Sequence, residues 1–195
     1  MTVGIVSEVS PGERRVAMVP GAIAVLNKTG TQFLMEAGAG LRAGFPDSEY
    51  AEKGVRIANS REEVFQSADV VVEVRSPGAN PETGAVDLAL LRQGQTLIGF
   101  GEPLTALDAA RSLAERGVSF LAMELMPRIT RAQSMDALSS MATVAGYKAV
   151  LLAADALPRM FPMLMTAAGT IAPAREMVAR TAPGSVVMGI VLAPS

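Results

Sequence analysis

The 195-residue chain contains no cysteine, no histidine and no tryptophan. Without cysteine, the sequence excludes disulfides, thiolate metal ligands and cysteine nucleophiles. Without histidine, it excludes a Ser–His or Cys–His relay and zinc held by imidazole groups. Any proton transfer must therefore use Asp, Glu, Lys, Tyr or a cofactor, and we expect no metal site.

An excess of either charge is also lacking, since 17 Lys and Arg residues face 19 Asp and Glu residues. No Lys/Arg run is interleaved with aromatic residues, so we expect no nucleic-acid partner. The start, MTVGIVSEV, lacks the basic residues and long apolar core of a secretion signal. No uncharged run reaches the roughly 20 residues needed to cross a bilayer. These absences predict a cytoplasmic, soluble protein.

Half of the residues are apolar, and short apolar runs alternate with amphipathic segments over residues 1 to 125. We predict strands over 2–6, 32–36, 69–74, 95–100 and 118–122. We predict helices over 21–28, 61–67, 86–93 and 106–116, the last capped by Thr105 and ended by Gly117. Strands that alternate with helices imply βαβ crossovers, so we expect a doubly wound α/β fold with a mostly parallel sheet.

The pattern changes at Ser134, where helical spacing with few breakers predicts a single helix of about 20 residues with Ser134 as its N-cap. A connector punctuated by Gly and Pro, FPMLMTAAGTIAPA, follows this helix. The tail predicts a short helix over 175–180 and a strand over 185–192. We therefore divide the chain into an α/β domain, residues 1–133, and a second region, residues 134–195.

The glycines Gly38, Gly40 and Gly44 follow a predicted strand and suggest a dinucleotide-binding loop. Their spacing is G-x-G-x-x-x-G, however, and a helix restart at Phe45-Pro46-Asp47 follows them. The dinucleotide fingerprint needs G-x-G-x-x-G at the opening of a long helix. We interpret the glycines as a flexible loop.

Two arginines lie where predicted strands end, at the edge of an α/β sheet where ligands bind. Arg15 follows the first strand in PGERRVA, and Arg75 follows the central strand. Either guanidinium can grip a carboxylate or a phosphate, so both are candidate cations of the crevice. The alternatives are an ion pair with Glu13 or solvation for Arg15, and an exposed loop end for Arg75.

The segment RITRAQSMDALS, residues 128–139, is a polar loop that leads into the long helix. It combines the guanidinium groups of Arg128 and Arg131, the amide of Gln133 and the free N–H groups of a helix N-terminus. Asp136 and Ser139 are three residues apart and share a helix face. Such a set can hold a polar ring or a ribose. The alternative is a cap without ligand, which does not need Arg128, Arg131 and Gln133 together.

The chain resembles the α subunit of proton-translocating NAD(P) transhydrogenase as far as Ala174. The resemblance is carried by MELMPRITRAQSMDALSSMATVAGYKAVLLAA, FPMLMTAAGTIAPA, SPGERRVAMVP, GAGLRAGFPDSEY and ADVVVEVRSP. It implies that Arg128, Gln133 and Asp136 form the family's Arg–Gln–Asp loop, where the nicotinamide of NAD(H) meets NADP(H) held by another subunit. It also implies that Ser139 contacts the nicotinamide end. The implied reaction is direct hydride transfer between nicotinamides, which the protein orients.

Alanine dehydrogenase shares the fold that this resemblance implies. In that enzyme an arginine after the first strand and a lysine after the central strand hold the keto acid, and a histidine transfers a proton. Arg15 matches that arginine, Arg75 stands at the lysine position, and the histidine region reads Gly99-Phe100-Gly101-Glu102. Because the chain has no histidine, we do not expect amino-acid dehydrogenation of that type.

After Ala174 the family continues with a Rossmann subdomain for the adenosine and pyrophosphate, whereas this sequence reads REMVARTAPGSVVMGIVLAPS. We therefore expect an enzyme subunit that holds the nicotinamide end of NAD(H) and needs a Rossmann half and the NADP-binding membrane subunit from other chains. Such partners would place it at the inner face of the membrane. The alternative is a truncated, inactive homologue that acts as an interaction or remnant protein.

An apolar group near the connector bears on the oligomeric state. It comprises Met160, Phe161, Met163, Leu164 and Met165. Exposed apolar patches of this kind usually find a partner surface, so we expect a homodimer or a hetero-oligomer.

Overall fold

The computed structural model describes residues 1–157, 160, 163–171, 178–182 and 185–188. The chain forms two compact units, Met1–Met126 and Pro127–Ser195. The boundary expected at residue 133 falls within the second of these units.

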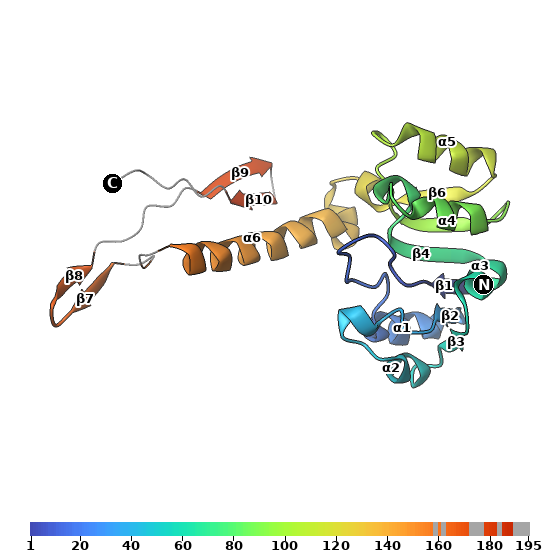
Figure 1. Ribbon diagram of the computed structural model, residues 1–195, viewed down its shortest axis with the longest axis horizontal. Coiled ribbons are helices and arrows are strands. Elements are labelled where there is room, and N and C mark those ends of the chain that lie inside the picture. Colours follow the sequence, from blue (N-terminus) through green and yellow to red (C-terminus); the bar gives the residue numbers. More distant parts are fainter. Residues whose placement is uncertain (158–159, 161–162, 172–177, 183–184, 189–195) are drawn as a thin grey trace. The chain divides into compact units, whose positions relative to one another are not determined.

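A six-stranded sheet lies at the centre of the first unit (Figure 1). Its strands are β1 (Thr2–Ile5), β2 (Gln32–Glu36), β3 (Arg56–Ala58), β4 (Val70–Arg75), β5 (Thr96–Phe100) and β6 (Ser119–Ala122). The order is β3-β2-β1-β4-β5-β6, and every neighbouring pair is parallel. The chain therefore winds outward in both directions from a switch point between β1 and β4. This confirms the predicted fold class, although the three-residue strand β3 was not predicted.

Helices cover the sheet from both faces. α1 (Pro20–Leu26) and α2 (Asp47–Ala51) supply the core on one face, whereas α3 (Arg61–Ser67), α4 (Gly84–Leu90) and α5 (Leu107–Glu115) supply it on the other. Ser60 caps α3, since its hydroxyl accepts a hydrogen bond from the Glu63 N–H at 3.2 Å. The central strand β4 is buried on both sides over Val71–Val74, as its β-branched run at Val70–Val72 predicts.

The ends of α5 test two details of the sequence-based prediction. The predicted cap at Thr105 is wrong, because α5 begins after Ala106 and has no side-chain cap. The Thr105 hydroxyl instead donates to the carbonyl oxygen of Glu102 at 3.3 Å. Gly117 follows the end of α5 as predicted and has a left-handed φ of 67°, a conformation that glycine adopts without a steric penalty.

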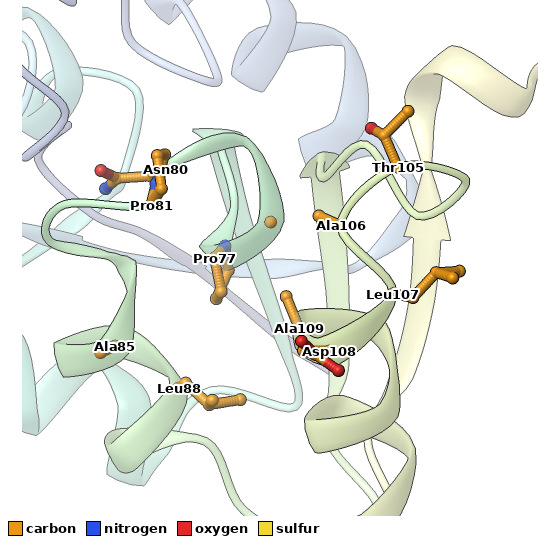
Figure 2. Close-up of a pocket in the computed structure, with 11 residues that line it drawn as sticks. Pro77, Asn80, Pro81, Ala85, Leu88, Thr105, Ala106, Leu107, Asp108 and Ala109 are labelled. Atoms are coloured by element: carbon orange, nitrogen blue, oxygen red, sulfur yellow. The ribbon is translucent and has the colours of Figure 1, made fainter.

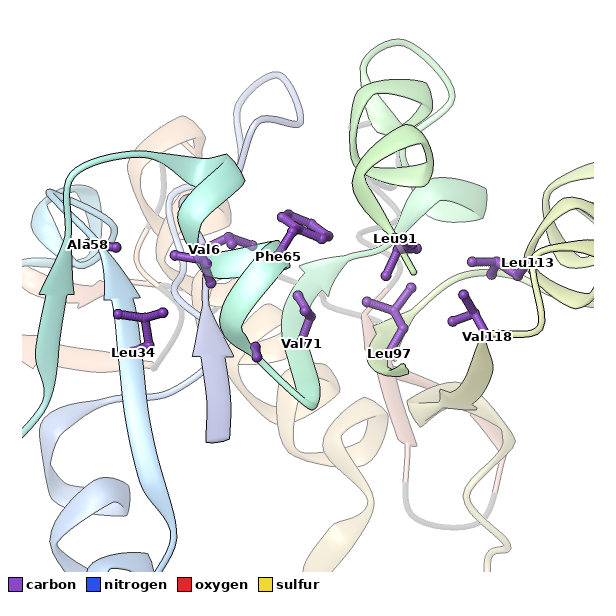
Figure 3. Packing of buried hydrophobic residues seen from close by; sticks show 11 residues of the cluster. Val6, Leu34, Ala58, Phe65, Val71, Leu91, Leu97, Leu113 and Val118 are labelled. Atoms are coloured by element: carbon purple, nitrogen blue, oxygen red, sulfur yellow. The ribbon is translucent and has the colours of Figure 1, made fainter. Parts of the chain in front are cut away.

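Two buried apolar clusters stabilise the layers. Figure 3 shows the first cluster, in which Phe65 of α3 lies near Val71 of β4 and Leu97 of β5 packs close to Leu91. The second cluster joins Ile23 of α1 and Tyr50 of α2 to the opposite face of the sheet. Full burial of such a side chain contributes about 1.5–3 kcal/mol relative to exposure, so these clusters dominate the stability of the first unit.

The second unit begins with a 3-10 segment, Thr130–Met135, followed by helix α6 (Ala137–Ala156). This confirms one long helix but corrects its start, because Asp136 and not Ser134 is the N-cap. By length and composition α6 can cross a membrane, with a mean hydropathy of 1.4, yet Lys148 and Asp155 interrupt its apolar surface. A single helix of this kind is weak support for a membrane span.

Two antiparallel hairpins follow α6. They are formed by β7 (Leu164–Thr166) with β8 (Gly169–Ile171), and by β9 (Val178–Ala182) with β10 (Ser185–Met188). The helix predicted over 175–180 is wrong for 178–180, which belong to β9, and 175–177 lie outside the described residues. The predicted strand over 185–192 is confirmed for 185–188, and the rest of it lies outside the described residues. Pro-Gly between two short runs favours a hairpin over a helix.

A tight contact between β1 and α3 gives a first testable prediction. A Cβ atom on Gly4 would lie 2.6 Å from Val64 Cγ1 and 2.8 Å from Ala68 Cβ. Gly4→Ala must therefore push the helix away from the strand, and we expect the free energy of unfolding to fall by about 1–3 kcal/mol in urea denaturation. Gly21→Ala is the control, since a Cβ at this helical position meets nothing within 4 Å. Equal stability of the two variants would refute the steric explanation.

Candidate functional site

The edge of the sheet at the β1–β4 switch point is bridged by Glu8, on the loop after β1. Its carboxylate accepts hydrogen bonds from the backbone N–H groups of Val74, at 2.5 Å, and Arg75, at 3.1 Å. Its carbonyl oxygen accepts a hydrogen bond from the Arg42 guanidinium. Burial raises the pKa of the Glu8 carboxyl, although the two backbone hydrogen bonds act in the opposite direction. Glu8 therefore joins the loop after β1 to the end of β4 at the carboxyl edge of the sheet.

Arg15 lies on the loop after β1 and pairs with Glu13. Its Nε is 2.8 Å from Glu13 Oε1 and its Nη2 is 2.6 Å from Oε2, which makes a two-point ion pair. The hydrogen bond from Arg15 lowers the pKa of Glu13 to about 2. The ion-pair alternative thus describes Arg15 in this structure, and its guanidinium is already engaged.

Arg75 ends β4 and turns back onto its own loop. Its Nε and Nη2 donate to the carbonyl oxygen of Ala79, at 2.8 Å and 2.5 Å. That carbonyl ends the 3-10 turn Pro77–Ala79, so the guanidinium holds the turn that follows the central strand. Arg15 follows β1 and Arg75 ends β4, and each is held by a partner from its own loop.

A buried ionic cluster at the same edge was not predicted. Arg61, at the start of α3, places Nε 2.5 Å from Asp87 Oδ1 and Nη1 2.9 Å from Glu36 Oε2. Its Nη1 also donates to the carbonyl oxygen of Ser7 at 2.8 Å, and its Nη2 lies 3.8 Å from Glu73 Oε1. A glutamate inside the apolar strand VVVEVR was the one sequence signal for this cluster.

In the polar loop of the second unit, Asp136 forms two hydrogen bonds with Ser139. Its Oδ1 accepts the Ser139 N–H at 3.0 Å and its Oδ2 accepts the Ser139 hydroxyl at 2.6 Å. The Ser139 hydroxyl, then its backbone N–H, and more weakly the charge of Arg128 lower the pKa of Asp136. An aspartate replaces Ser134 as the cap because its carboxylate satisfies both donors of Ser139 at once. The predicted pair Asp136 and Ser139 is therefore brought together.

Three further polar side chains belong to the same loop. Arg128, Arg131 and Gln133 are all exposed, and Gln133 lies in the 3-10 segment next to the cap. Within the described residues, no protein group forms a hydrogen bond with any of these three side chains. The cap uses none of them, so they remain available to a ligand.

The glycine loop binds its own chain. The Gly38 N–H donates to both carboxylate oxygens of Asp47 at 3.0 Å, and Asp47 starts α2. A Cβ at Gly40 would lie 2.5 Å from the Phe45 carbonyl oxygen and 2.6 Å from the Tyr50 ring. Gly40 permits close packing, and Gly38 and Gly44 adopt left-handed φ angles of 79° and 91°. The loop is thus built into the fold by Asp47 and Tyr50, which differs from the flexible loop expected from the sequence.

A cavity of about 290 Å³ lies between the Pro77–Ala79 turn, α4 and the start of α5 (Figure 2). Most of its lining is apolar, with Pro77, Ala85, Leu88 and Ala109 among the contributing residues. It includes none of the six residues predicted for the site, all of which the structure describes. None of the predicted residues therefore lines this cavity. Among the described residues, no group of three Asp or Glu side chains has the geometry of a metal site.

The 3-2-1-4-5-6 order of parallel strands defines a doubly wound α/β domain. A profile described as "Alanine dehydrogenase/PNT, N-terminal domain" matches residues 4–145. The chain therefore belongs to the alanine dehydrogenase/PNT N-terminal domain family.

Transhydrogenase subunits are among the similar proteins. The NAD(P) transhydrogenase subunit alpha of Cereibacter sphaeroides is 43% identical over 91% of this chain and 33% of its own length. An NAD(P) transhydrogenase alpha-subunit protein of Rhodospirillum rubrum is 42% identical over 91% of this chain and 46% of its own. The crystal structure of transhydrogenase from Sinorhizobium meliloti matches with a TM-score of 0.79 and 41% identity over 89% of this chain and 50% of that one. This chain thus spans half or less of these relatives.

Alanine dehydrogenases are more distant. The enzyme of Mycolicibacterium smegmatis is 28% identical over 91% of this chain and 47% of its own length. A solved L-alanine dehydrogenase matches with a TM-score of 0.71 at 24% identity over 80% of this chain and 40% of that one, which shows a shared fold. The similar proteins therefore include transhydrogenases and alanine dehydrogenases, and the transhydrogenases have the higher sequence identity.

The Glu13–Arg15 pair gives a second prediction. The folded pKa of Glu13 is about 2 and an unperturbed glutamate titrates near 4.3, so the pair stabilises the fold above about pH 4.3 and loses its effect as the pH falls toward 2. Arg15→Gln should raise the pKa of Glu13 toward the unperturbed value in a carbon-13 NMR titration. Arg14→Gln should leave it unchanged, because Arg14 meets Glu13 only through its backbone N–H among the described residues. An unmoved pKa in the Arg15 variant would contradict the assignment.

Proposed function

We propose that this chain is the nicotinamide-binding portion of an NAD(P) transhydrogenase α subunit. In this function the chain orients NAD(H) for direct hydride transfer to or from NADP(H) carried by another subunit. The observation that carries the proposal is the group of exposed side chains beside the start of α6. Arg128 and Gln133 are left unused by the helix cap and lie within the segment that resembles the family's Arg–Gln–Asp loop.

The chemistry of this group suits an uncharged polar ring. The Gln133 amide both donates and accepts hydrogen bonds, which matches the carboxamide of a nicotinamide. Arg128 adds donors and positive charge, and Asp136 and Ser139 add a carboxylate and a hydroxyl on a rigid helix end. Hydride transfer needs the two rings to be held in register and needs no acid or base from the protein. A site without histidine can meet that need.

In this proposal the pyrophosphate and adenosine of NAD(H) are anchored outside these 195 residues. The 195 residues contain no G-x-G-x-x-G run, and the Gly38 loop is occupied by Asp47. A Rossmann half must therefore supply the pyrophosphate and adenosine contacts, and an NADP-binding subunit must supply the second nucleotide. Attachment to such subunits would place the chain at the cytoplasmic face of the membrane.

A pair of substitutions tests the proposed site. Gln133→Ala removes an exposed amide, and Asp136→Asn keeps a good helix cap but removes the charge. In a complex reconstituted with a Rossmann half and an NADP-binding subunit, each should slow hydride transfer by about 10- to 100-fold, because ring placement is lost. Stopped-flow absorbance of NADH reports the rate.

Ser134→Ala is the matched control, because Ser134 is exposed in the same 3-10 segment and does not cap α6. Its rate should equal that of the unmodified chain. The melting temperature of all three variants should stay unchanged. Loss of stability with an unchanged rate would show that the loop serves only as a helix cap.

A catalytically silent role is the second candidate function. It is favoured by the internal hydrogen bonds of Arg15, Arg75 and the Gly38 loop, which leave the crevice of the first unit occupied by the protein itself. In that role the chain binds a partner subunit without nucleotide. Co-purification with a transhydrogenase subunit in the absence of nucleotide, together with no NADH binding in the full complex, would favour it over the first candidate.

The apolar surface of the second unit predicts self-association or assembly. Met160, Met163 and Met165 are 51%, 61% and 84% exposed, Leu164 is half-buried, and Phe161 lies outside the described residues. The helix α6 adds exposed Val144, Leu151 and Leu152. We expect light scattering to give at least the mass of a dimer for the isolated chain, because such surface is usually covered. A monomer at high concentration would contradict this expectation.

A further inference from the structure

The Arg61 cluster has more acidic groups than cations. Glu36 at the end of β2, Glu73 in β4 and Asp87 in α4 all lie within 4 Å of the single Arg61 guanidinium. Glu8, on the loop after β1, is close enough for its charge to act on Glu73. If all four carboxyl groups were ionised, the cluster would carry three uncompensated negative charges in a buried place. Such an arrangement is costly at low local dielectric.

Glu73 is the member with the fewest partners. Its side chain is 2% exposed, and neither carboxylate oxygen has a hydrogen-bond donor among the described residues. Asp87 and Glu36, in contrast, each accept a direct hydrogen bond from Arg61, and Glu8 accepts two from the backbone. A buried carboxylate without donors is strongly disfavoured, whereas a buried carboxylic acid is tolerated.

Two further buried polar groups of the turn after β4 are without hydrogen-bond partners among the described residues. The Ser76 hydroxyl is fully buried and the Asn80 amide nitrogen is buried, and both lack a partner in the described residues. A hydroxyl can accept a hydrogen bond from a protonated carboxyl and can donate one to its carbonyl oxygen. The Ser76 hydroxyl can therefore serve either protonation state of Glu73, and the neutral acid is favoured by the burial of Glu73 and by the excess of carboxyl groups around Arg61.

We propose that Glu73 is a buried proton-binding group, so that the Arg61 cluster takes up one proton when the chain folds and keeps it at neutral pH. Loss of this proton would place a new negative charge beside Asp87 and Glu8. Glu8 holds the backbone of Val74 and Arg75, so the charge would act on the connection between β1 and β4. The cluster thus makes the connection between the loop after β1 and the end of β4 sensitive to pH, and no nucleotide is needed for this effect.

The electrostatics of the neighbouring groups agree with this inference. Burial, followed by the charges of Asp87 and Glu8, raises the pKa of Glu73 well above its usual range, against the opposing effects of the Arg61 charge and the Ser76 hydroxyl. A group whose pKa is higher in the folded state stabilises the fold fully below its unfolded pKa of about 4.3. That stabilisation is lost progressively as the pH rises from there through the folded pKa. Raising the pH should therefore weaken the fold through Glu73.

Thermal unfolding of Glu73→Gln between pH 4 and pH 9 tests the proposal. Glutamine imitates the neutral acid, so the variant should match the unmodified chain near pH 4. At higher pH it should become the more stable protein, and the difference in melting temperature should grow by about 3–5 °C per pH unit up to the folded pKa. Glu115→Gln makes the same charge change at an exposed position at the end of α5 and should give a pH-independent difference.

A Glu73→Gln variant that is destabilised equally at every pH would overturn the proposal, because it would show that folding does not raise the pKa of Glu73. A direct measurement serves if that variant does not fold. In the unmodified chain labelled with carbon-13 glutamate, one side-chain carboxyl should still give the protonated chemical shift at pH 7. Asp87→Asn should lower its titration midpoint by removing a negative neighbour. Titration of every glutamate below about pH 6 would equally overturn the proposal.

Discussion

The guanidinium of Arg61 connects segments of the first unit that the sheet itself cannot join at its carboxyl edge. From the first turn of α3 it bonds Ser7 after β1, Glu36 at the end of β2 and Asp87 in α4. In a doubly wound sheet the chain leaves β1 and β4 in opposite directions, so side chains such as Arg61 and Glu8 must connect the segments at this edge. Removal of one partner from such a buried set leaves a charge uncompensated, which typically costs about 3–5 kcal/mol. The positions of the loop after β1, the end of β2 and the start of α4 therefore depend on the Arg61 side chain.

A side chain at the carboxyl edge of this sheet is not necessarily free to bind a ligand. Arg15 and Arg75 both lie at the carboxyl edge, yet one is paired with Glu13 and the other with the Ala79 carbonyl. The side chains beside the start of α6 show the opposite combination. Arg128 and Gln133 belong to the second unit and are exposed, without protein partners in the described residues. This contrast is why the proposed nicotinamide contacts are assigned to the second unit.

The regular elements of the fold could be predicted because their causes are local. The β-branched run of β4 and the apolar spacing of α3 are visible within a few residues, whereas β3 is too short to show a period. Contacts set by tertiary structure could not be predicted in this way. Arg61 meets Ser7 across 54 positions, and no nearby residue signals that contact. The polar loop was predicted as a group, but the choice of Asp136 over Ser134 as cap depends on backbone geometry at the start of α6.

The hydroxyl of Ser139 is already committed in the isolated chain. It donates its one proton to Asp136 Oδ2 at 2.6 Å, while the second carboxylate oxygen holds the Ser139 backbone. A ligand that accepts a hydrogen bond from this hydroxyl must take it from the aspartate, whereas a ligand that donates to the hydroxyl finds its lone pairs available. In the proposed site, Ser139 would therefore favour the donor side of a carboxamide or a ribose and disfavour the acceptor side. Competition between Asp136 and the ligand for the Ser139 hydroxyl would therefore set the orientation of a bound ring.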